Sequence, residues 1–199
     1  MADLILGSTT VMSESGGVIS GIPAAGITGT FGSGVTFPAG HVVKVYYDTD
    51  STTQTGSQTA HTWYNSLLSI TLTPVSINSK FVIQGHWSHR GTSNGSAMKI
   101  VRDGATEPST GSTLIGDEAG TRFRATLAYS YEGFDANQRN QLAYSVHDDP
   151  DTALELTYRL QYMTESTSYY INRNENYPNA AVNYAAVDVS TMTIFEISS

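Results

Sequence analysis

The chain has 199 residues, a formal net charge of −8 and a charged fraction of 14%, well below the ~25% of an average soluble domain. The acidic balance excludes nucleic acid as an expected partner, because phosphate binding needs clustered Lys and Arg, and the absence of cysteine excludes disulfides and thiolate metal sites. No apolar run approaches the roughly 20 residues of a membrane span, and the N-terminus lacks the basic start of an export signal. We therefore expect a cytosolic product with no export signal that does not insert into membranes.

Residues 1–40 differ in composition from everything that follows. Between Ser15 and Val43 there is no charged residue and glycine recurs throughout, so ordering this stretch alone would cost too much backbone entropy. A plain flexible linker, however, would not carry seven large apolar side chains. These are Val18, Ile19, Ile22, Ile27, Phe31, Val35 and Phe37. We predict an extended Gly-rich N-terminal arm that orders against partner chains through residues such as Ile22, Ile27 and Phe31; a disordered leader is the alternative.

From residue 41 to residue 199 the hydrophobic pattern has a period of two, which is the period of β-strands. Alternating apolar residues mark strands near 43–47, 68–72, 81–87, 98–100, 123–131, 142–146, 154–162 and 169–171. Polar or turn-rich stretches separate them, among them 48–60, 91–95, 148–151 and 173–183. No stretch has a convincing helical period. The pattern predicts an all-β head domain over residues 41–199, an antiparallel β-sandwich for which a jelly roll is the expected arrangement.

The last strand, Val187 to Ile197, is apolar on both faces. Val187, Val189, Phe195 and Ile197 fall on one face, whereas Met192 and Ile194 fall on the other. A strand of this kind should be covered on both sides. One cover is the protein's own core, and we predict that the other is a copy of the same chain, with Met192 and Ile194 at the interface of a homotrimer. The alternative is an ordinary central strand whose second face lies under a loop.

Metal sites and catalytic motifs are poorly supported. His86 and His89 are three residues apart and would point to opposite faces of a strand. The run Asp148-Asp149-Pro150-Asp151 could offer oxygen ligands to Ca²⁺, but it also has the composition of a tight turn, which we favour. There is no G-x-S-x-G elbow and no recognisable histidine motif. We expect no enzyme, no cofactor and no metal, although the fold could still assemble a carboxylate pair for glycoside hydrolysis.

Aromatic residues are the better candidates for binding. Twelve Tyr and two Trp offer large, rigid, amphipathic contact area at low entropy cost. Tyr169, Tyr170 and Tyr177 lie near predicted strand ends or loops, where a sugar or a protein could stack on them. With Arg173 they are our candidate receptor contacts; for any one of them a place in the core is the alternative.

Several segments together resemble a C-terminal domain of tailed-phage proteins, mainly from aquatic phages, that are described as tail fibres or virion structural proteins. The most specific are IGDEAGTRFRA, from Ile115 to Ala125, and YINR, from Tyr170 to Arg173. The resemblance spans about Pro38 to Ile197 and also takes in SITLTPVSINSKFVIQG, MKIVRDG and STMTIFEI. It implies a trimeric, particle-bound protein with a β-sandwich head and no catalytic residues.

The resemblance and the short leader favour a phage short fibre or spike. In this hypothesis the arm docks on other virion proteins and the head contacts a host cell-surface glycan or protein. Many such fibres have long repetitive shafts, whereas about forty residues precede this head. Two alternatives remain: a capsid decoration protein, such as a head fibre or cement protein, without a receptor role, and a depolymerase-like enzyme on the same scaffold.

Overall fold

The computed structural model describes the strands of residues 3–6, 9–15 and 18–20, and residues 38–91, 95–102, 114–130, 140–173 and 187–199. The chain divides into two compact units, Met1–Thr36 and Phe37–Ser199. The first contains three short antiparallel strands in the order β1 (Asp3–Leu6), β2 (Thr9–Ser15) and β3 (Val18–Ser20). Of the predicted arm contacts, Ile22, Ile27 and Phe31 lie outside the described residues.

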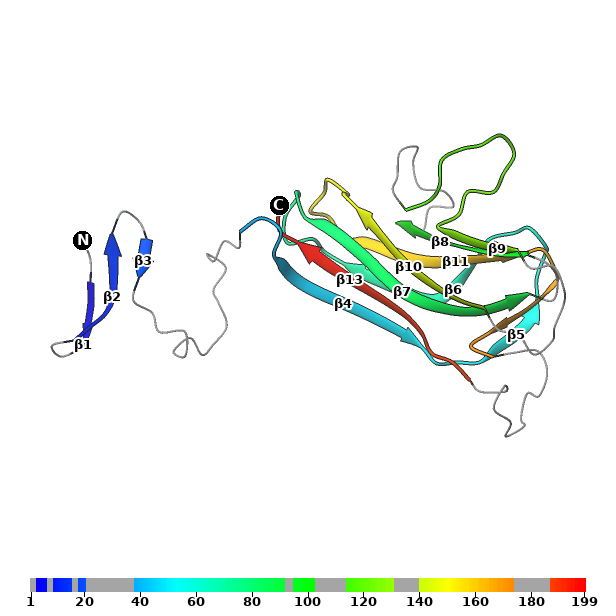
Figure 1. Ribbon diagram of the computed structural model, residues 1–199, viewed down its shortest axis with the longest axis horizontal. Helices are drawn as coiled ribbons and strands as arrows, with labels where there is room; N and C mark the ends of the chain where they lie inside the picture. The colour runs from blue at the N-terminus through cyan, green and yellow to red at the C-terminus, as the bar shows by residue number, and fades with distance from the viewer. Residues whose placement is uncertain are drawn as a thin grey trace. The chain divides into compact units, whose positions relative to one another are not determined.

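The second unit is a sandwich of two antiparallel sheets (Figure 1). The first sheet has β4, β13, β7, β12 and β5 as neighbours, with β10 on β7, and the second has the order β6, β11, β8, β9. The strands of the first sheet are β4 (Val42–Asp50), β5 (Gln54–Ser57), β7 (Lys80–Gly91), β10 (Asn140–Asp148), β12 (Ser168–Ile171) and β13 (Ser190–Ile197). Those of the second are β6 (Tyr64–Leu72), β8 (Gly95–Arg102), β9 (Leu127–Ser130) and β11 (Leu156–Thr164).

Eight of these strands pair in a nested way. β4 pairs with β13, β6 with β11, β7 with β10 and β8 with β9, all antiparallel. The first strand thus pairs with the last and each later strand with its counterpart from the other end, as when a long hairpin is rolled into two sheets. This is the strand order of a jelly roll. It confirms the predicted all-β antiparallel sandwich and adds the strand order, which the sequence pattern did not contain. The described residues include no helix, and hence none that could span a membrane.

Two segments differ from the sequence-based prediction. The stretch 48–60, predicted to be a polar loop, contains the four-residue strand β5. The alternation from Phe123 to Tyr131 was predicted to be one strand, yet the regular strand begins only at Leu127 and the residues before it form a loop. As a consequence Phe123 is 55% exposed rather than buried.

The core lies between the two sheets and follows the alternation of the strands. Its buried side chains include Leu68, Phe81, Ile83, Trp87, Met98, Ile100, Tyr158, Leu160 and Ile171. Met192 and Ile194 belong to the same cluster, and neither is exposed. The prediction that these two residues face a second subunit is therefore wrong, because the chain's own second sheet covers them.

The opposite face of β13 is the one that points outward. Phe195 lies between Val45 of β4 and Val82 of β7 in the strand register, so three apolar side chains form a row across three strands. Val45 is 49% exposed and Tyr47, one pair further along β4, is 78% exposed. We call Val45, Tyr47, Val82 and Phe195 the outer row.

The two ends of the sandwich are distinguished by the chain segments that lie there. At the first, which we call the entry end, the Gly40 amide donates to Ser198 O (2.7 Å), so the chain enters the sandwich beside its own last strand. The second, which we call the distal end, is where β4 and β7 finish and β8 begins (Figure 1). Gly91 and Arg173 are both at the distal end: Gly91 ends β7, and Arg173 follows Asn172, whose side-chain Nδ2 donates to Asp50 O (2.8 Å).

Candidate functional site

A surface cavity of about 450 Å³ opens at the distal end. It lies within the range of about 300–1,000 Å³ that small-molecule sites occupy. The residues around it come from four sections of the chain that are distant in sequence. They are His61, Gly95, Ser96, Ala97, Arg122, Phe123, Ala125, Ala128, Tyr129, Met163 and Glu165.

The floor of the cavity is the outer surface of the second sheet, hollowed by small residues. Ala128, Ala97 and Met163 lie side by side in the register of β9, β8 and β11, so two of the three side chains in this row are single methyl groups. Gly95, two residues before Ala97, has no side chain, and the Glu165 carboxyl group takes that space: a Cβ on Gly95 would come within 2.6 Å of it. The local shape of the floor therefore follows from the sequence pattern Gly-x-Ala at residues 95–97.

One wall of the cavity is the loop that precedes β9, with the sequence from Ile115 to Ala125. Its ends are joined because the Gly116 amide donates to Ala125 O (3.0 Å). The Arg124 Nε also donates to Gly116 O (2.8 Å). Gly120, at φ 63°, makes the reversal that a residue with a side chain rarely adopts. These bonds hold the loop in a fixed shape with Arg122 and Phe123 toward the cavity.

The other wall is His61, from the connection between β5 and β6. Its backbone has the positive φ of 59°, and its amide donates to Thr164 O at 2.9 Å, which anchors it to the end of β11. The His61 and Phe123 rings are parallel within 4°, with centroids 5.8 Å apart. The two exposed rings therefore form one stacked pair at the mouth of a cavity with an apolar floor, in which each ring covers one face of the other. Arg122 and Glu165 add one positive and one negative charge, and Glu165 is the single carboxylate among the described lining residues.

Of the predicted receptor contacts, Tyr169, Tyr170 and Arg173 lie at the same end of the sandwich but do not line the cavity. Tyr169 points inward, where its ring packs on Tyr162 at 5.5 Å and against the core. Tyr170 points the other way, and the guanidinium groups of Arg90 and Arg173 each lie 5.9 Å from the centre of its ring. Tyr170 and Arg173 thus form a cation–π pair at the surface, while Tyr177 lies outside the described residues.

The histidines of β7 are structural. His86 faces β13, where its Nδ1 lies 3.1 Å from the Thr191 hydroxyl and its Nε2 contacts Val189 O. His89 is 1% exposed and stacks on Trp87 with ring centroids 4.3 Å apart. Burial lowers the pKa of His89 to about 3. The two side chains do not share a ligand position, in agreement with the three-residue spacing.

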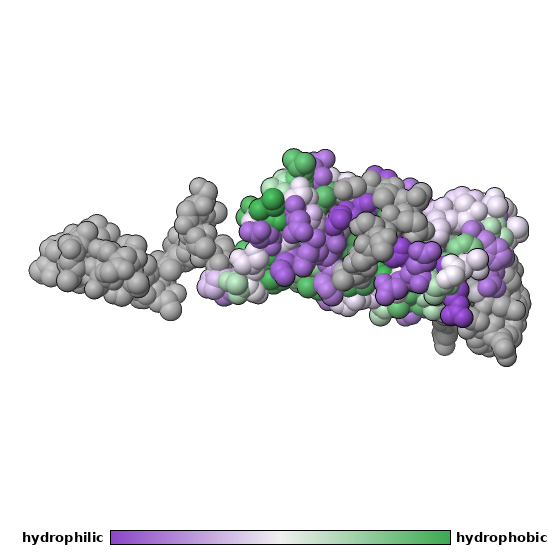
Figure 2. All heavy atoms as spheres, turned by 90° about the horizontal axis from the view of Figure 1, so that it is seen from above, coloured by the Kyte–Doolittle hydropathy of each residue, from purple (hydrophilic) through white to green (hydrophobic). Residues whose placement is uncertain are grey.

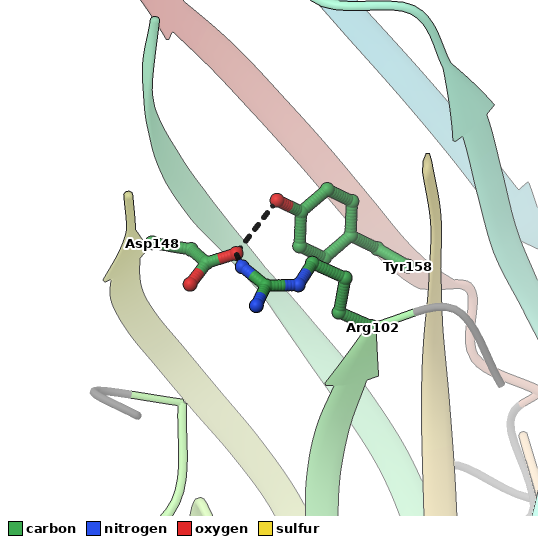
Figure 3. Close-up of polar contacts among 3 residues, drawn as sticks. All are labelled: Arg102, Asp148 and Tyr158. Carbon is green, nitrogen blue, oxygen red and sulfur yellow. Dashed lines mark hydrogen bonds and ion pairs between the residues drawn. The ribbon is translucent and has the colours of Figure 1, made fainter. Parts of the chain in front are cut away.

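Two aspartates of the 148–151 segment, Asp148 (Figure 3) and Asp149, pair with cations from the chain itself. One Asp148 carboxylate oxygen accepts from Arg102 at 2.6 Å and from the Tyr158 hydroxyl at 2.8 Å. Asp149 pairs with Lys80 at 3.4 Å. The described residues contain no group of three acidic or histidine side chains that could hold an ion. Arg102 and Lys80 therefore supply the opposite charge beside Asp148 and Asp149.

Comparison with protein-family models finds no match, and neither does comparison with characterised proteins. Among solved structures, the chain is similar to the VP2 protein of the infectious bursal disease virus subviral particle, with 14% identity, a TM-score of 0.35 and coverage of 77% of this chain. A structure of the Gx strain of the same virus gives 14% identity, a TM-score of 0.36 and coverage of 89%. The chain spans 41% and 47% of those two chains, and the similarity is too low to assign it a role.

Proposed function

We propose that this chain is a structural protein of a virion, and specifically a short phage fibre or spike whose jelly-roll head contacts the host surface. One observation carries the proposal: the block Ile115–Ala125, the most specific part of the resemblance to phage fibre domains, folds as the wall of a surface cavity at the distal end. A segment that served only the core would not be expected to present Phe123 to solvent.

The position of the chain entry supports the same orientation. The arm joins the head at Pro38–His41, next to Ser198 and therefore at the entry end. An arm that docks on other virion proteins would leave the opposite end free. Both the cavity and the Tyr170–Arg173 pair belong to that opposite end. In a sandwich the loops at strand ends are the parts that carry recognition.

We still propose a homotrimer, but with a different face of β13 at the subunit interface. Since Met192 and Ile194 are inside the core, the outer row is the apolar surface that a second copy would cover. On the described part of the face drawn in Figure 2, hydrophobic residues occur in small groups separated by hydrophilic ones. A threefold axis would bring three copies of Val45 and Phe195 together and remove them from water.

A competition assay tests the host-contact role directly. Host cells are incubated with the purified full chain before particles are added, and adsorption is measured as particles left in the supernatant. We expect adsorption to fall as the chain saturates its target. A chain that accumulates in purified particles and yet never competes would favour the capsid decoration alternative.

A further inference from the structure

We infer that the distal cavity binds a neutral saccharide, with one sugar ring against the aromatic side chains of His61 and Phe123. This inference deepens the proposed function by giving the chemical class of the target and the site that takes it. Three features of the cavity favour such a ligand: the shape of its floor, the exposure of its rings and the balance of its charges.

The rings supply the surface that a sugar needs. The apolar face of a pyranose, with its row of C–H groups, packs against an aromatic plane, while its hydroxyls at the rim require hydrogen bonds. Phe123 is 55% exposed although the loop that carries it is held by backbone bonds at both ends. Its ring is therefore presented without a further cost of ordering the loop.

The floor and the rim of the cavity supply the apolar base and the polar groups that a bound sugar also needs. The buried row of Ala97 and Met163 offers an apolar base, and the space above it exists because positions 97 and 128 carry single methyl groups. Arg122 can donate to hydroxyl oxygens and Glu165 can accept from hydroxyl hydrogens. A site with apolar floor, flat rings and a few polar groups at the edge is the usual form of a small-ligand site.

Charge selects a neutral ligand over an acidic one. Among the described lining residues, Arg122 is the one Lys or Arg side chain and Glu165 is the one carboxylate, and the whole chain carries a formal net charge of −8. An anionic sugar would approach against this field. A neutral sugar gains little from electrostatics, so its binding should depend weakly on salt.

The test is saturation-transfer NMR on the full chain with four probes at millimolar concentration: methyl β-galactoside, methyl α-glucoside, N-acetylglucosamine and, as the acidic probe, N-acetylneuraminic acid. We expect transfer to at least one neutral probe. Phe123→Ala should weaken that binding by about tenfold, and Ala128→Leu, which fills the hollow, should abolish it. Leu154→Ala is the matched control, since Leu154 is 75% exposed and is not among the residues that line the cavity.

All three variants should keep the melting temperature of the parent, because each changes an exposed side chain. Transfer to none of the neutral probes would overturn the inference, as would transfer to N-acetylneuraminic acid alone or equal transfer in parent and Ala128→Leu. The two proposals can fail separately. If the full chain competes for host cells equally well with Phe123→Ala, the host-contact role stands and the saccharide site does not; if neutral sugars bind but the chain never competes, the reverse holds.

Discussion

The side chain of Asn172 accepts a hydrogen bond from the Ser190 hydroxyl at 2.6 Å, and this bond joins the end of β12 to the start of β13. The same amide donates from Nδ2 to Asp50 O at 2.8 Å and to Thr52 O at 3.1 Å. Asn172 is fully buried and has the positive φ of 57°. One residue of the YINR block thus holds three segments of the distal end in place.

Asn172→Ala should destabilise the head by about 3 kcal/mol or more, because it leaves the Asp50 carbonyl and the Ser190 hydroxyl without their partner and puts a Cβ-bearing residue without a side-chain amide at positive φ. Asn172→Asp should cost at least as much, since a carboxylate would face two carbonyl oxygens. Urea unfolding measures both. Asn78→Ala, at an exposed position, is the control and should change stability by less than about 0.5 kcal/mol. A similar small effect at Asn172 would contradict this account of the distal end.

Asp148→Ala should cost about 3–5 kcal/mol, because it leaves the Arg102 guanidinium and the Tyr158 hydroxyl without the carboxylate that both contact. Tyr158→Phe removes a single bond and should cost about 1 kcal/mol. The double variant should be less destabilised than the sum of the two, since both act on one network. Asp149→Ala breaks an ion pair whose side chains are 58% and 50% exposed, and it should be nearly neutral. Equal losses of unfolding free energy at the two aspartates would contradict a larger stabilising contribution from the buried network.

His89 should make the head sensitive to acid. The Ser96 hydroxyl donates to Met163 O (2.9 Å) and lies 2.8 Å from His89 Nδ1, so Nδ1 is the donor in that contact. The His89 Nε2 has no hydrogen-bond partner in the described part of the chain. Because burial lowers the pKa of His89 to about 3 from 6.5, its stabilising contribution is complete above pH 6.5. It is lost as pH falls toward 3, by about 1.4 kcal/mol per pH unit.

His89→Phe keeps a ring against Trp87 but has nothing to protonate. The unfolding free energy of the parent should therefore fall relative to that of the variant as pH is lowered from 6.5 to 4. Chemical denaturation at a series of pH values gives this difference. Curves for parent and variant that stay parallel over that range would refute the assignment.

Two aspartate substitutions on the same strand should separate core from interface. Met192→Asp places a carboxylate in the core and should prevent folding, at a cost of several kcal/mol. Phe195→Asp changes the outer row and should leave a folded head that no longer assembles. Light scattering and circular dichroism distinguish the two. A parent chain that is monomeric at micromolar concentration would refute the trimer itself.

The alternation of apolar and polar residues was enough to predict the class of the fold and most of its strands. The strand at Val187–Ile197 and those around Leu68, Phe81, Met98 and Leu160 follow from alternation, and the structure confirms them. Alternation cannot say which face of a strand is covered by the same chain: Met192 and Phe195 are equally apolar, and only the second sheet decides that Met192 is inside. The nested strand pairing was likewise invisible, since it depends on long-range contacts.

The candidate site was harder to predict for a related reason. Phe123 continues the alternation of β9, so the pattern counted it as a strand residue, although the backbone bonds between Gly116 and Ala125 hold it in a loop. Gly95 and Ala97 were an available signal, because two small residues at alternate positions of an otherwise bulky strand indicate a hollow on one face. Their partners His61 and Glu165 come from distant parts of the sequence, and nothing local links them.

Cryo-electron microscopy of the intact particle tests the central claim most directly, because it locates the chain and gives the direction of its distal end. The account predicts heads in groups of three with the outer rows at the axis, held through residues 1–40, and with His61 and Phe123 facing away from the particle. Heads that lie against the capsid with the cavity packed on a neighbouring protein would contradict it.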